Sequence, residues 1–459
     1  MNQFLYTLLL RLAKPIILNI LEKKAKKAGG LWDIRGNERF GIYPKKENIK
    51  PVSEQSDFDV RGHQFEFKNP IWVHAVSLGE TRAAQPFVRI LLDQGHPVLL
   101  THTTSTGRAQ GARQFSEDIG EGRLVQAWMP YDLPEAVDGF LTHWMPRCGI
   151  LIEREVWPNM VLSAACQKIP MILASARFSE SSAKQVKLLG GVLLEAYKKL
   201  SLILAQTQQD AERLESIGLP MPKVIGNLKF DVDISMQQVD LGAMLRQSIN
   251  RHVVVIASTR EGEEQVFIQG ISQLKAANAN VTNEADKQLL PLYVIIPRHP
   301  QRFAQVEEIL KKSSLTYVRR TDNPSDKDIR QADVLFGDSL GEMFYYYGLA
   351  DVAIIGGSFG DFGGQNHIEA CAVGVPVIVG PHTKNFEKAV NDALIEGAAR
   401  RTDSEHNALL LANALLNDDE QRKQMGKAGK QWLTLHQGVS QRLYSCLLYT
   451  SDAADDSLR

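Results

Sequence analysis

Several features are scarce or missing in this chain of 459 residues. It has four cysteines and no C-x-x-C pair, which is typical of a reducing compartment and argues against a disulfide framework or a cysteine zinc site. The formal net charge is -1, so the composition shows no general affinity for polyanions, and we expect no nucleic-acid partner. With 44% hydrophobic and 23% charged residues, the chain is otherwise that of an ordinary globular protein with two or three domains.

The familiar phosphate and metal motifs are also missing. No Gly-Lys-Ser/Thr follows the glycine-rich stretch of the second half, so that stretch is not a P-loop, and it does not read G-x-G-x-x-G. No D-x-D motif stands in a loop suited to a metal ion. We therefore expect neither a metal nor a bound cofactor.

The N-terminus lacks both a signal peptide and an uninterrupted apolar run. Residues 4–21 are largely apolar but contain Arg11 and Lys14, and four lysines follow within residues 23–27. A signal peptide would place its charge first and a small-residue cleavage site afterwards, and a charge near the middle of a spanning helix costs about 2.5–3.5 kcal/mol. We therefore expect residues 1–27 to form an interfacial membrane anchor, with a single short span or a buried first helix as alternatives.

Beyond the anchor, strand-like and helix-like stretches alternate along the chain. The apolar runs that read as buried strands are residues 71–75, 97–101, 124–128, 149–152, 170–174, 202–205 and 223–225, followed by 252–257, 291–296, 334–336, 352–355 and 376–379. This alternation argues for parallel sheets with right-handed crossovers. Because the pattern restarts past a joint near residues 226–231, we predict an α/β fold with two Rossmann-like, doubly wound domains, residues 28–230 and 231–445, facing a cleft.

Two segments fall outside this alternation. Residues 45–69 are polar and have no period, which favours a loop or a hairpin insertion. Residues 446–459 end in a polar, acidic run that resembles translated adapter sequence. We treat them as a non-native, disordered tail and leave them out of the predicted fold.

The stretch at residues 356–370, GGSFGDFGGQNHIEA, organises the second half. Its glycines allow the backbone to approach a ligand closely, and the helical residues 368–373 that follow would offer a positive N-terminus to a phosphate. Glu369, in the first turns of that helix, is placed to accept hydrogen bonds from ribose hydroxyls. This is the layout of a nucleotide-sugar site at the carboxyl end of a doubly wound sheet, although a plain tight turn would give the same pattern.

Many motifs together resemble those of the bacterial 3-deoxy-D-manno-octulosonate (Kdo) transferases. These are inverting glycosyltransferases of the two-Rossmann-domain (GT-B) type, in glycosyltransferase family 30. The matching stretches, in family order, are residues 38–41, 74–80, 103–107, 153–159, 176–179, 226–231, 258–263, 297–300, 337–342, 356–370 and 380–386. The resemblance implies transfer of Kdo from CMP-Kdo to a lipid A precursor (lipid IVA) in lipopolysaccharide synthesis, at the cytoplasmic face of the bacterial inner membrane.

The sequence departs from the family pattern at three positions. Ser175 stands where the family usually has Asn, and Gln365 and His367 replace a His and a Pro of the family's loop. Asn366 and Glu369 of that loop are retained. The departures leave any role of a loop histidine open.

Inverting transfer requires a base for the acceptor hydroxyl and a stabiliser for the departing phosphate. By resemblance, Glu38 is the base. We predict that the acceptor is bound by residues near the ends of the first-half strands, Ser77, Gly79, Glu80, Glu153, Glu155 and Arg177. A strand would place Glu153 and Glu155 on one face, but a helix cap for Ser77 and Glu80, or a salt bridge from Glu153 to Arg177, would explain these residues without a ligand.

The donor is predicted to bind to residues of the second half and of the joint. Arg298 follows a buried strand, and its guanidinium fork matches phosphate oxygens. The full predicted donor set is Lys229, Ser258, Arg260, Arg298, Gly357, Ser358, Asn366 and Glu369.

Two other functions stay open at this point. A two-domain nucleotide-sugar epimerase or a glucosaminyltransferase would share the sheets and the glycine loop, but not the stretch at residues 74–80 or the basic anchor. A catalytically inactive, membrane-bound binding homologue would keep all of these features, and only an activity assay separates it from an enzyme.

Overall fold

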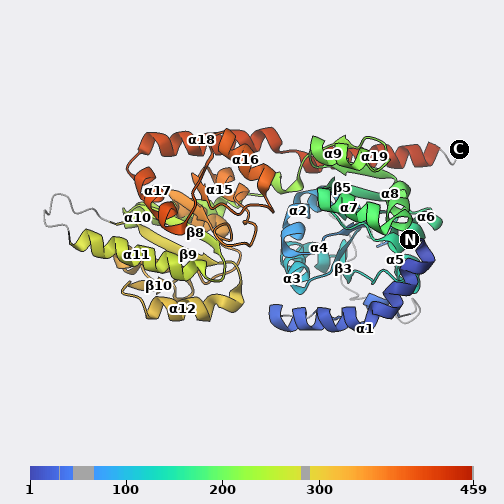
Figure 1. Cartoon of the computed structure of the whole chain (residues 1–459), viewed down its shortest axis with the longest axis horizontal. Helices are drawn as coiled ribbons and strands as arrows, with labels where there is room; N and C mark the ends of the chain where they lie inside the picture. The colour runs from blue at the N-terminus through green and yellow to red at the C-terminus, as the bar shows by residue number, and fades with distance from the viewer. Residues whose placement is uncertain (30–31, 45–66, 281–289, 457–459) are drawn as a thin grey trace. The chain divides into compact units, whose positions relative to one another are not determined.

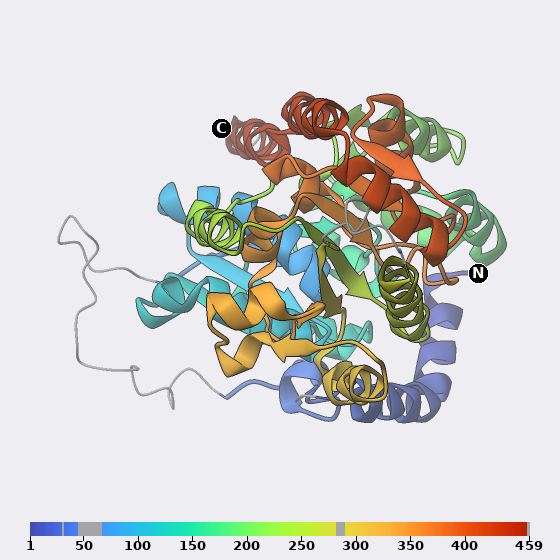
Figure 2. The same cartoon turned by 90° about the vertical axis from the view of Figure 1, so that its left-hand side faces the viewer.

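The structure is a computed structural model that describes residues 1–29, 32–44, 67–280 and 290–456. The chain forms two compact units (Figure 1). The first comprises Met1–Asp231 and Gly438–Arg459, and the second comprises Val232–Gln437. In Figure 2 the helices and strands of the second unit face the viewer. The loop or hairpin expected at residues 45–69 lies, as far as residue 66, outside the described residues.

The first unit is built on a seven-stranded parallel sheet in the order β3-β2-β1-β4-β5-β6-β7. Its strands are β1 (Ile71–His74), β2 (Val98–His102), β3 (Leu124–Trp128), β4 (Cys148–Ile152), β5 (Met171–Ala176), β6 (Leu202–Ala205) and β7 (Lys223–Val224). Its helices are α1 (Gln3–Ala28), η1 (Asn37–Phe40), α2 (Leu78–Asp93), α3 (Ser105–Gln114), α4 (Ser116–Gly120), α5 (Pro134–Trp144), α6 (Pro158–Cys166), α7 (Glu180–Leu189), α8 (Gly191–Lys199), α9 (Gln208–Glu215), η3 (Leu228–Phe230) and α19 (Val439–Asp456). The strand order reverses between β1 and β4, and ligands of such sheets bind beyond the carboxyl ends of the strands at this point.

Strand β1 shows why these segments become central strands. All four of its residues are buried, and they pair with β2 on one side and β4 on the other. Ile71 and Val73 belong to one hydrophobic cluster, whereas Trp72 belongs to a second one, as alternation along a strand requires. A strand with apolar side chains on both faces is stable only between two layers of helices.

The second unit repeats this plan with the sheet order β10-β11-β9-β8-β12-β13-β14. Its strands are β8 (Val253–Thr259), β9 (Leu292–Pro297), β10 (Tyr317–Arg319), β11 (Val334–Phe336), β12 (Val352–Ile355), β13 (Val377–Val379) and β14 (Ala399–Arg401). Its helices are α10 (Met236–Ile249), α11 (Glu263–Ala279), η5 (Pro300–Arg302), α12 (Phe303–Lys311), η6 (Arg320–Asp322), α13 (Asp326–Gln331), α14 (Met343–Leu349), α15 (Ile368–Val373), α16 (Glu387–Ile395), α17 (Glu405–Leu416) and α18 (Asp419–His436). The predicted pair of Rossmann-like parallel-sheet domains is confirmed.

Strands β10 and β14 did not appear among the predicted strands. They lie at the two edges of the second sheet, and most of their residues are partly or fully exposed. Each ends in arginine, so neither presents the continuous apolar run that marks a strand buried on both faces.

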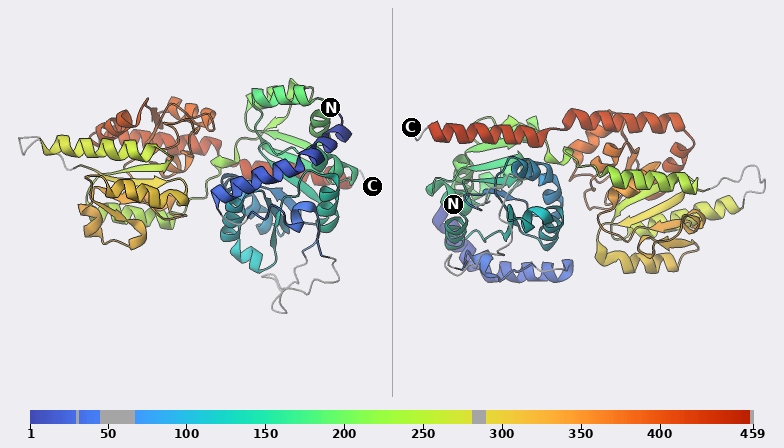
Figure 3. Two further views of the ribbon diagram at one scale, coloured as in Figure 1. Left: turned by 60° about the horizontal axis from the view of Figure 1, so that its bottom comes forward. Right: turned by 180° about the vertical axis from the view of Figure 1, so that it is seen from behind.

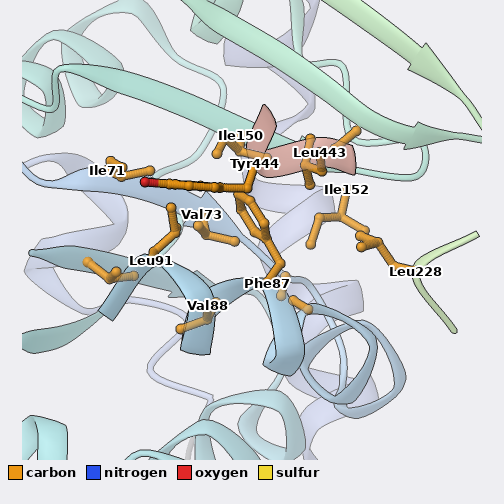
Figure 4. Close-up of a cluster of buried hydrophobic side chains, with 14 of the residues drawn as sticks. Ile71, Val73, Phe87, Val88, Leu91, Ile150, Ile152, Leu228, Leu443 and Tyr444 are labelled. Carbon is orange, nitrogen blue, oxygen red and sulfur yellow. The ribbon is translucent and has the colours of Figure 1, made fainter. Parts of the chain in front are cut away.

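Helix α19 corrects two predictions about the C-terminus. We placed the second domain as far as residue 445 and expected a disordered tail from residue 446. The chain instead returns to the first unit at Gly438, and α19 is helical through Asp456. Leu443 and Leu447 lie one helical turn apart and are buried in the core of the first unit, where Figure 4 shows Leu443 and Tyr444 beside side chains from β1 and α2.

The two points at which the chain crosses between the units are joined by Asp231. Its Oδ1 accepts hydrogen bonds from the N–H groups of Gly438 at 2.7 Å and Val439 at 3.1 Å, and its Oδ2 accepts from Ser440. A carboxylate at the N-terminus of α19 also complements the helix dipole. The last residue of the family stretch at residues 226–231 therefore fixes the start of the returning helix.

Helix α1 runs along the first unit (Figure 3), and polar side chains connect it to that unit. The Tyr6 hydroxyl donates to Asp132 Oδ2 at 2.8 Å, and Gln3 and Thr7 donate to Asn159 Oδ1 at 3.2 and 3.1 Å. Most apolar side chains of the helix are exposed, which is contrary to the buried-first-helix alternative. Among the described residues, α1 is the one helix that is long and apolar enough to cross a membrane, by length and composition.

Candidate active site

Glu38 is held beside the carboxyl end of β3. Its Oε2 accepts a hydrogen bond from the backbone N–H of Trp128 at 2.8 Å and lies 3.5 Å from Nη1 of Arg108. The side chain remains 34% exposed. The carboxylate is thus fixed in direction and still open to a ligand.

Arg39 is the buried support of this carboxylate. It is 3% exposed, and its Nη2 donates to the carbonyl oxygens of Trp32 and Thr103, both at 2.9 Å. The guanidinium also lies 4.4 Å from the centre of the Trp128 ring. Burial lowers the pKa of Arg39 to about 10, which leaves it charged at neutral pH. Arg39 therefore ties the short helix of Glu38 to the segments beneath it, a role that we had not assigned from the sequence.

Gly41 completes this arrangement because η1 lies directly against α5. Its φ of +68° is in the left-handed region, and a Cβ atom there would stand 2.1 Å from the carbonyl oxygen of Ala136. A Cβ on Gly139 would stand 2.2 Å from the carbonyl oxygen of Gly41. Only glycine at these two positions allows the backbone of η1 to approach α5 so closely.

Three of the predicted acceptor ligands form a carboxylate cluster beyond β1 and β4. Glu80 accepts a hydrogen bond from the N–H of Ser77 at 3.0 Å. Burial raises the pKa of Glu80 to about 7, and the charges of Glu153 and Glu155 add to the effect. Burial also raises the pKa of Glu155, whose Oε2 accepts from the Trp157 indole at 2.9 Å. Burial explains the shared upward direction of the two pKa shifts, and repulsion between the carboxylates adds to it.

The positions of Glu153 and Lys229 differ from the predictions. Strand β4 ends at Ile152, and Glu153 has a φ of +64°. A turn, and not one face of a strand, therefore brings Glu153 and Glu155 together. Lys229, predicted for the donor, lies in the first unit with its Nζ 2.5 Å from Glu153 Oε1. Lys229 lies beside these carboxylates because η3 precedes the crossing to the second unit, and its contact with the donor stays a prediction.

The other three predicted acceptor residues lie at the same edge of the sheet. Ser77 is the N-cap of α2 and forms a capping box with Glu80, as the alternative of a helix cap predicts. Gly79 is in the first turn of α2, where an added Cβ would meet only Ser77 Oγ, at 3.9 Å. Arg177 follows β5 and donates its backbone N–H to the carbonyl oxygen of Glu153 at 3.1 Å. The main chain of Arg177 is thus hydrogen-bonded to that of Glu153, and the space beside Gly79 is open.

In the second unit, two predicted donor arginines lie at the ends of β8 and β9. Arg260 Nη1 donates to Nε2 of His299 at 2.7 Å, and Arg298 Nε donates to Gln365 Oε1 at 3.0 Å. Partial burial and the charges of Arg260 and Arg298 lower the pKa of His299 to about 4, so this imidazole is a neutral acceptor at pH 7. The ring of Phe362 lies 4.8 Å from the Arg260 guanidinium. The result is a concentration of positive charge suited to an anionic group.

Gly357 and Ser358 have internal roles that differ from the expected donor contact. The Gly357 N–H donates to Glu263 Oε2 at 2.7 Å. Ser358 is fully buried, and its Oγ donates to the Ile355 carbonyl and accepts from the Gly380 N–H at 2.8 Å. These groups are hydrogen-bonded within the fold and shape the loop, and a donor contact at Gly357 or Ser358 stays a prediction.

Ser258, another predicted donor residue, has a left-handed backbone. Its φ is +59°, and it lies just before the end of β8.

Asn366 and Glu369, the last two predicted donor residues, are hydrogen-bonded to each other. Asn366 Oδ1 accepts from the N–H of Ile368 at 3.1 Å, and its Nδ2 donates to Glu369 Oε1 at the same distance. Asn366 therefore holds the first N–H of α15 and orients the Glu369 carboxylate.

The two departures in the glycine loop have separate explanations. Gln365 is the acceptor for Arg298 described above. His367 is fully buried and stacks on Trp432, with ring centres 5.7 Å apart. Burial lowers the pKa of His367 to about 4. His367 is thus a packing residue between the loop and α18, and Gln365 is the substitution that touches the arginine pair.

Two family models match parts of this chain. The family model described as 3-deoxy-D-manno-octulosonic-acid transferase (kdotransferase) matches residues 35–232, and the glycosyl transferases group 1 model matches residues 329–432. The 3-deoxy-D-manno-octulosonic acid transferase of Bordetella pertussis is 45% identical over 458 residues, which covers 100% of both chains. The chain belongs to the Kdo transferase family.

Other relatives agree with this family. The 3-deoxy-D-manno-octulosonic acid transferase of Haemophilus influenzae is 31% identical over 455 residues, covering 97% of this chain and 98% of the relative. A solved glycosyltransferase from Rickettsia africae shares the fold, with a TM-score of 0.54 at 12% identity, over 84% of this chain and 98% of that one. Membership of the Kdo transferase family makes the chain a glycosyltransferase and sets aside the epimerase and glucosaminyltransferase alternatives.

Proposed function

We propose that this Kdo transferase moves Kdo from CMP-Kdo to a lipid A precursor, lipid IVA, at the cytoplasmic face of the inner membrane. The observation that carries the proposal is the identity of 45% with the Bordetella pertussis enzyme over 458 residues. Transfer to the acceptor hydroxyl occurs with inversion at the anomeric carbon. CMP is the leaving group.

Glu38 is the general base of the proposed reaction. As the acceptor oxygen attacks the anomeric carbon, the Glu38 carboxylate takes the hydroxyl proton. The hydrogen bond from Trp128 and the nearby Arg108 support this role because they fix the carboxylate before the substrate arrives. The carboxylate cluster around Glu80 and Glu153 binds the hydroxyl groups of the acceptor sugar.

The departing CMP is stabilised by positive side chains and not by a metal ion. Arg260 and Arg298 bind the phosphate, and Asn366 and Glu369 bind the ribose. Guanidinium groups form strong, directional hydrogen bonds with phosphate. In this proposal the two arginines supply the positive charge that faces the phosphate of the leaving group.

Helix α1 holds the enzyme at the membrane surface where its lipid acceptor lies. Its apolar side chains point away from the folded unit, with Phe4 76%, Leu12 67% and Ile16 63% exposed. The polar contacts of Tyr6 and Thr7 hold the opposite side of the helix against the unit. An apolar face turned outward and a polar face bound to the unit favour a helix that lies in the membrane interface. A helix that spans the membrane would lose the hydrogen bonds of Tyr6 and Thr7 to the unit.

The proposed reaction is tested by incubating the full chain in membranes with labelled CMP-Kdo and a tetra-acylated lipid A precursor. Mass spectrometry of the lipid should show the precursor heavier by one or more Kdo units. A chain that binds CMP and yields no heavier lipid would be an inactive homologue, and a product from another nucleotide sugar would replace CMP-Kdo as the donor.

The membrane anchor predicts a change in fractionation. A triple variant, Phe4→Ser, Leu12→Ser and Ile16→Ser, should shift from the membrane pellet to the soluble fraction by about 10-fold or more, because it removes apolar area available to lipid. The control carries serines at Leu340, Ile395 and Leu435, which are exposed in the second unit, and should pellet like the parent. A triple variant that still pellets, with an unchanged melting temperature, would place the attachment on another surface.

The donor site predicts a loss of nucleotide affinity. Arg298→Ala and Glu369→Ala should each weaken CMP binding by roughly 1.5–3 kcal/mol, the worth of a charge-assisted hydrogen bond. Calorimetry on variants with unchanged melting temperatures measures the effect. Lys312→Ala removes an exposed positive charge of the same unit and should leave CMP affinity unchanged. Equal CMP affinity in both site variants and the parent would remove the two residues from the donor site.

A further inference from the structure

Glu263 has no assigned role, yet its carboxylate is buried and fully engaged in hydrogen bonds within the second unit. It opens α11, is 3% exposed, and accepts hydrogen bonds from three backbone N–H groups. Its Oε2 accepts from Arg260 at 2.8 Å and from Gly357 at 2.7 Å, and its Oε1 accepts from Phe359 at 3.1 Å.

These N–H groups come from two loops that are far apart in the sequence. Arg260 follows β8, whereas Gly357 and Phe359 follow β12, the neighbouring strand in the sheet. The loops lie so close that a Cβ on Gly356 would stand 2.6 Å from Thr259 Cα and 3.0 Å from Glu263 Oε2. The carboxylate therefore lies at the junction of the two loops and holds them at a fixed separation.

The glycine loop would otherwise present free N–H groups to an anion. Successive backbone N–H groups in glycine-rich turns form concave sites for phosphate or carboxylate. Here the anion is the protein's own side chain, because Glu263 already accepts from Gly357 and Phe359. A ligand phosphate is then left to the guanidinium groups of Arg260 and Arg298, not to the amides of residues 357 and 359.

We propose that Glu263 is a positioning residue for the donor: it fills the amide site of the glycine loop and clamps that loop to the Arg260 segment. The inference rests on the proposed function, since it takes CMP-Kdo to bind at Arg260 and Arg298. The adjacent Glu264 has different partners, Thr259 Oγ1 at 2.9 Å and Arg302 Nη1 at 2.6 Å, so the two acids are not interchangeable.

The test compares Glu263→Gln and Glu263→Ala with Glu261→Gln, which removes a negative charge from an exposed side chain of the same loop. Glutamine keeps the size of the side chain but replaces one oxygen with an NH2 group that faces backbone donors. We expect Glu263→Gln to weaken CMP binding roughly 10-fold or more, whereas Glu261→Gln binds like the parent. Calorimetry on proteins of equal melting temperature measures both.

Chemical rescue separates a positioning anion from general loss of structure. In Glu263→Ala the carboxylate is removed and its three N–H donors remain. Added formate should therefore restore CMP affinity at least several-fold, and chloride at the same ionic strength should not. If Glu263→Ala does not fold, amide hydrogen exchange of Glu263→Gln replaces it: exchange should accelerate at residues 260, 357 and 359.

The outcomes distinguish this inference from the proposed function. A parent protein that binds CMP, together with a Glu263→Gln variant of equal affinity and equal exchange at residues 357–359, would overturn the clamp. A parent that binds no CMP would overturn the proposed donor, and the exchange measurement would still decide whether Glu263 holds the two loops.

Discussion

Glu38→Gln is expected to lose about 10²–10⁴-fold in turnover, the usual worth of a general base. The amide cannot take the acceptor proton, but it keeps the size of the side chain and an oxygen that can accept from the Trp128 N–H. CMP affinity and melting temperature should therefore change little. Turnover with CMP-Kdo and lipid precursor, and CMP affinity by calorimetry, are measured on one preparation.

The matched control for this variant is Glu117→Gln. Glu117 is an exposed carboxylate of the same unit, so its replacement changes the net charge equally without touching the site. Near-normal turnover in Glu38→Gln would contradict the assignment of the base. Glu80 would then be the leading candidate, because burial and neighbouring carboxylates raise its pKa to about 7, a value suited to proton transfer at neutral pH.

The sequence predicted the buried strands of the fold correctly, but not the strands β10 and β14 or the boundary near the C-terminus. A strand covered on both faces must be apolar throughout, so β11 and β12 could be delimited from composition alone. The edge strands β10 and β14 need no such run, because each pairs with one neighbour and most of their residues are partly or fully exposed. Local patterning thus found the edge strands β3 and β7 of the first sheet, and it missed the two edge strands of the second sheet, which end in arginine and have no continuous apolar run.

In the candidate site, the sequence motifs located the right segments but not the contacts between them. Glu38 is bound by Trp128, 90 residues away, and Glu263 by Gly357, 94 residues away. Lys229 pairs with Glu153 across 76 residues. Such contacts depend on the order of strands in the sheet, which the spacing of residues does not reveal. For this reason the pairing of Lys229 with Glu153 was not predicted, and Arg39 and Glu263 received no role.

The C-terminal helix shows a different cause of error. Val439, Leu443 and Leu447 recur every four residues, which is the apolar stripe of a helix packed on a core. The acidic run that follows indicates a polar tail by its composition and does not show this stripe. The prediction of a tail from residue 446 was wrong because it rested on the acidic composition of the last residues, whereas the periodic apolar residues determine where the helix packs.

Leu443→Ala tests whether α19 is part of the first unit. Leu443 is fully buried among β1, β4 and α2 side chains (Figure 4), and removing a buried leucine side chain typically costs about 2–5 kcal/mol. We expect the unfolding free energy of the first unit to fall by that amount. Leu433→Ala is the matched variant, because Leu433 is a buried leucine in α18 of the second unit.

Amide hydrogen exchange followed by mass spectrometry locates each effect, because the two units need not unfold as one. Leu443→Ala should accelerate exchange in β1 and α2 and leave α15 as in the parent. Leu433→Ala should accelerate exchange in α15, against which α18 packs, and leave β1 protected. If Leu443→Ala loosened α15, or left β1 and α2 fully protected, α19 would not be a structural part of the first unit, and the original boundary at residue 445 would stand.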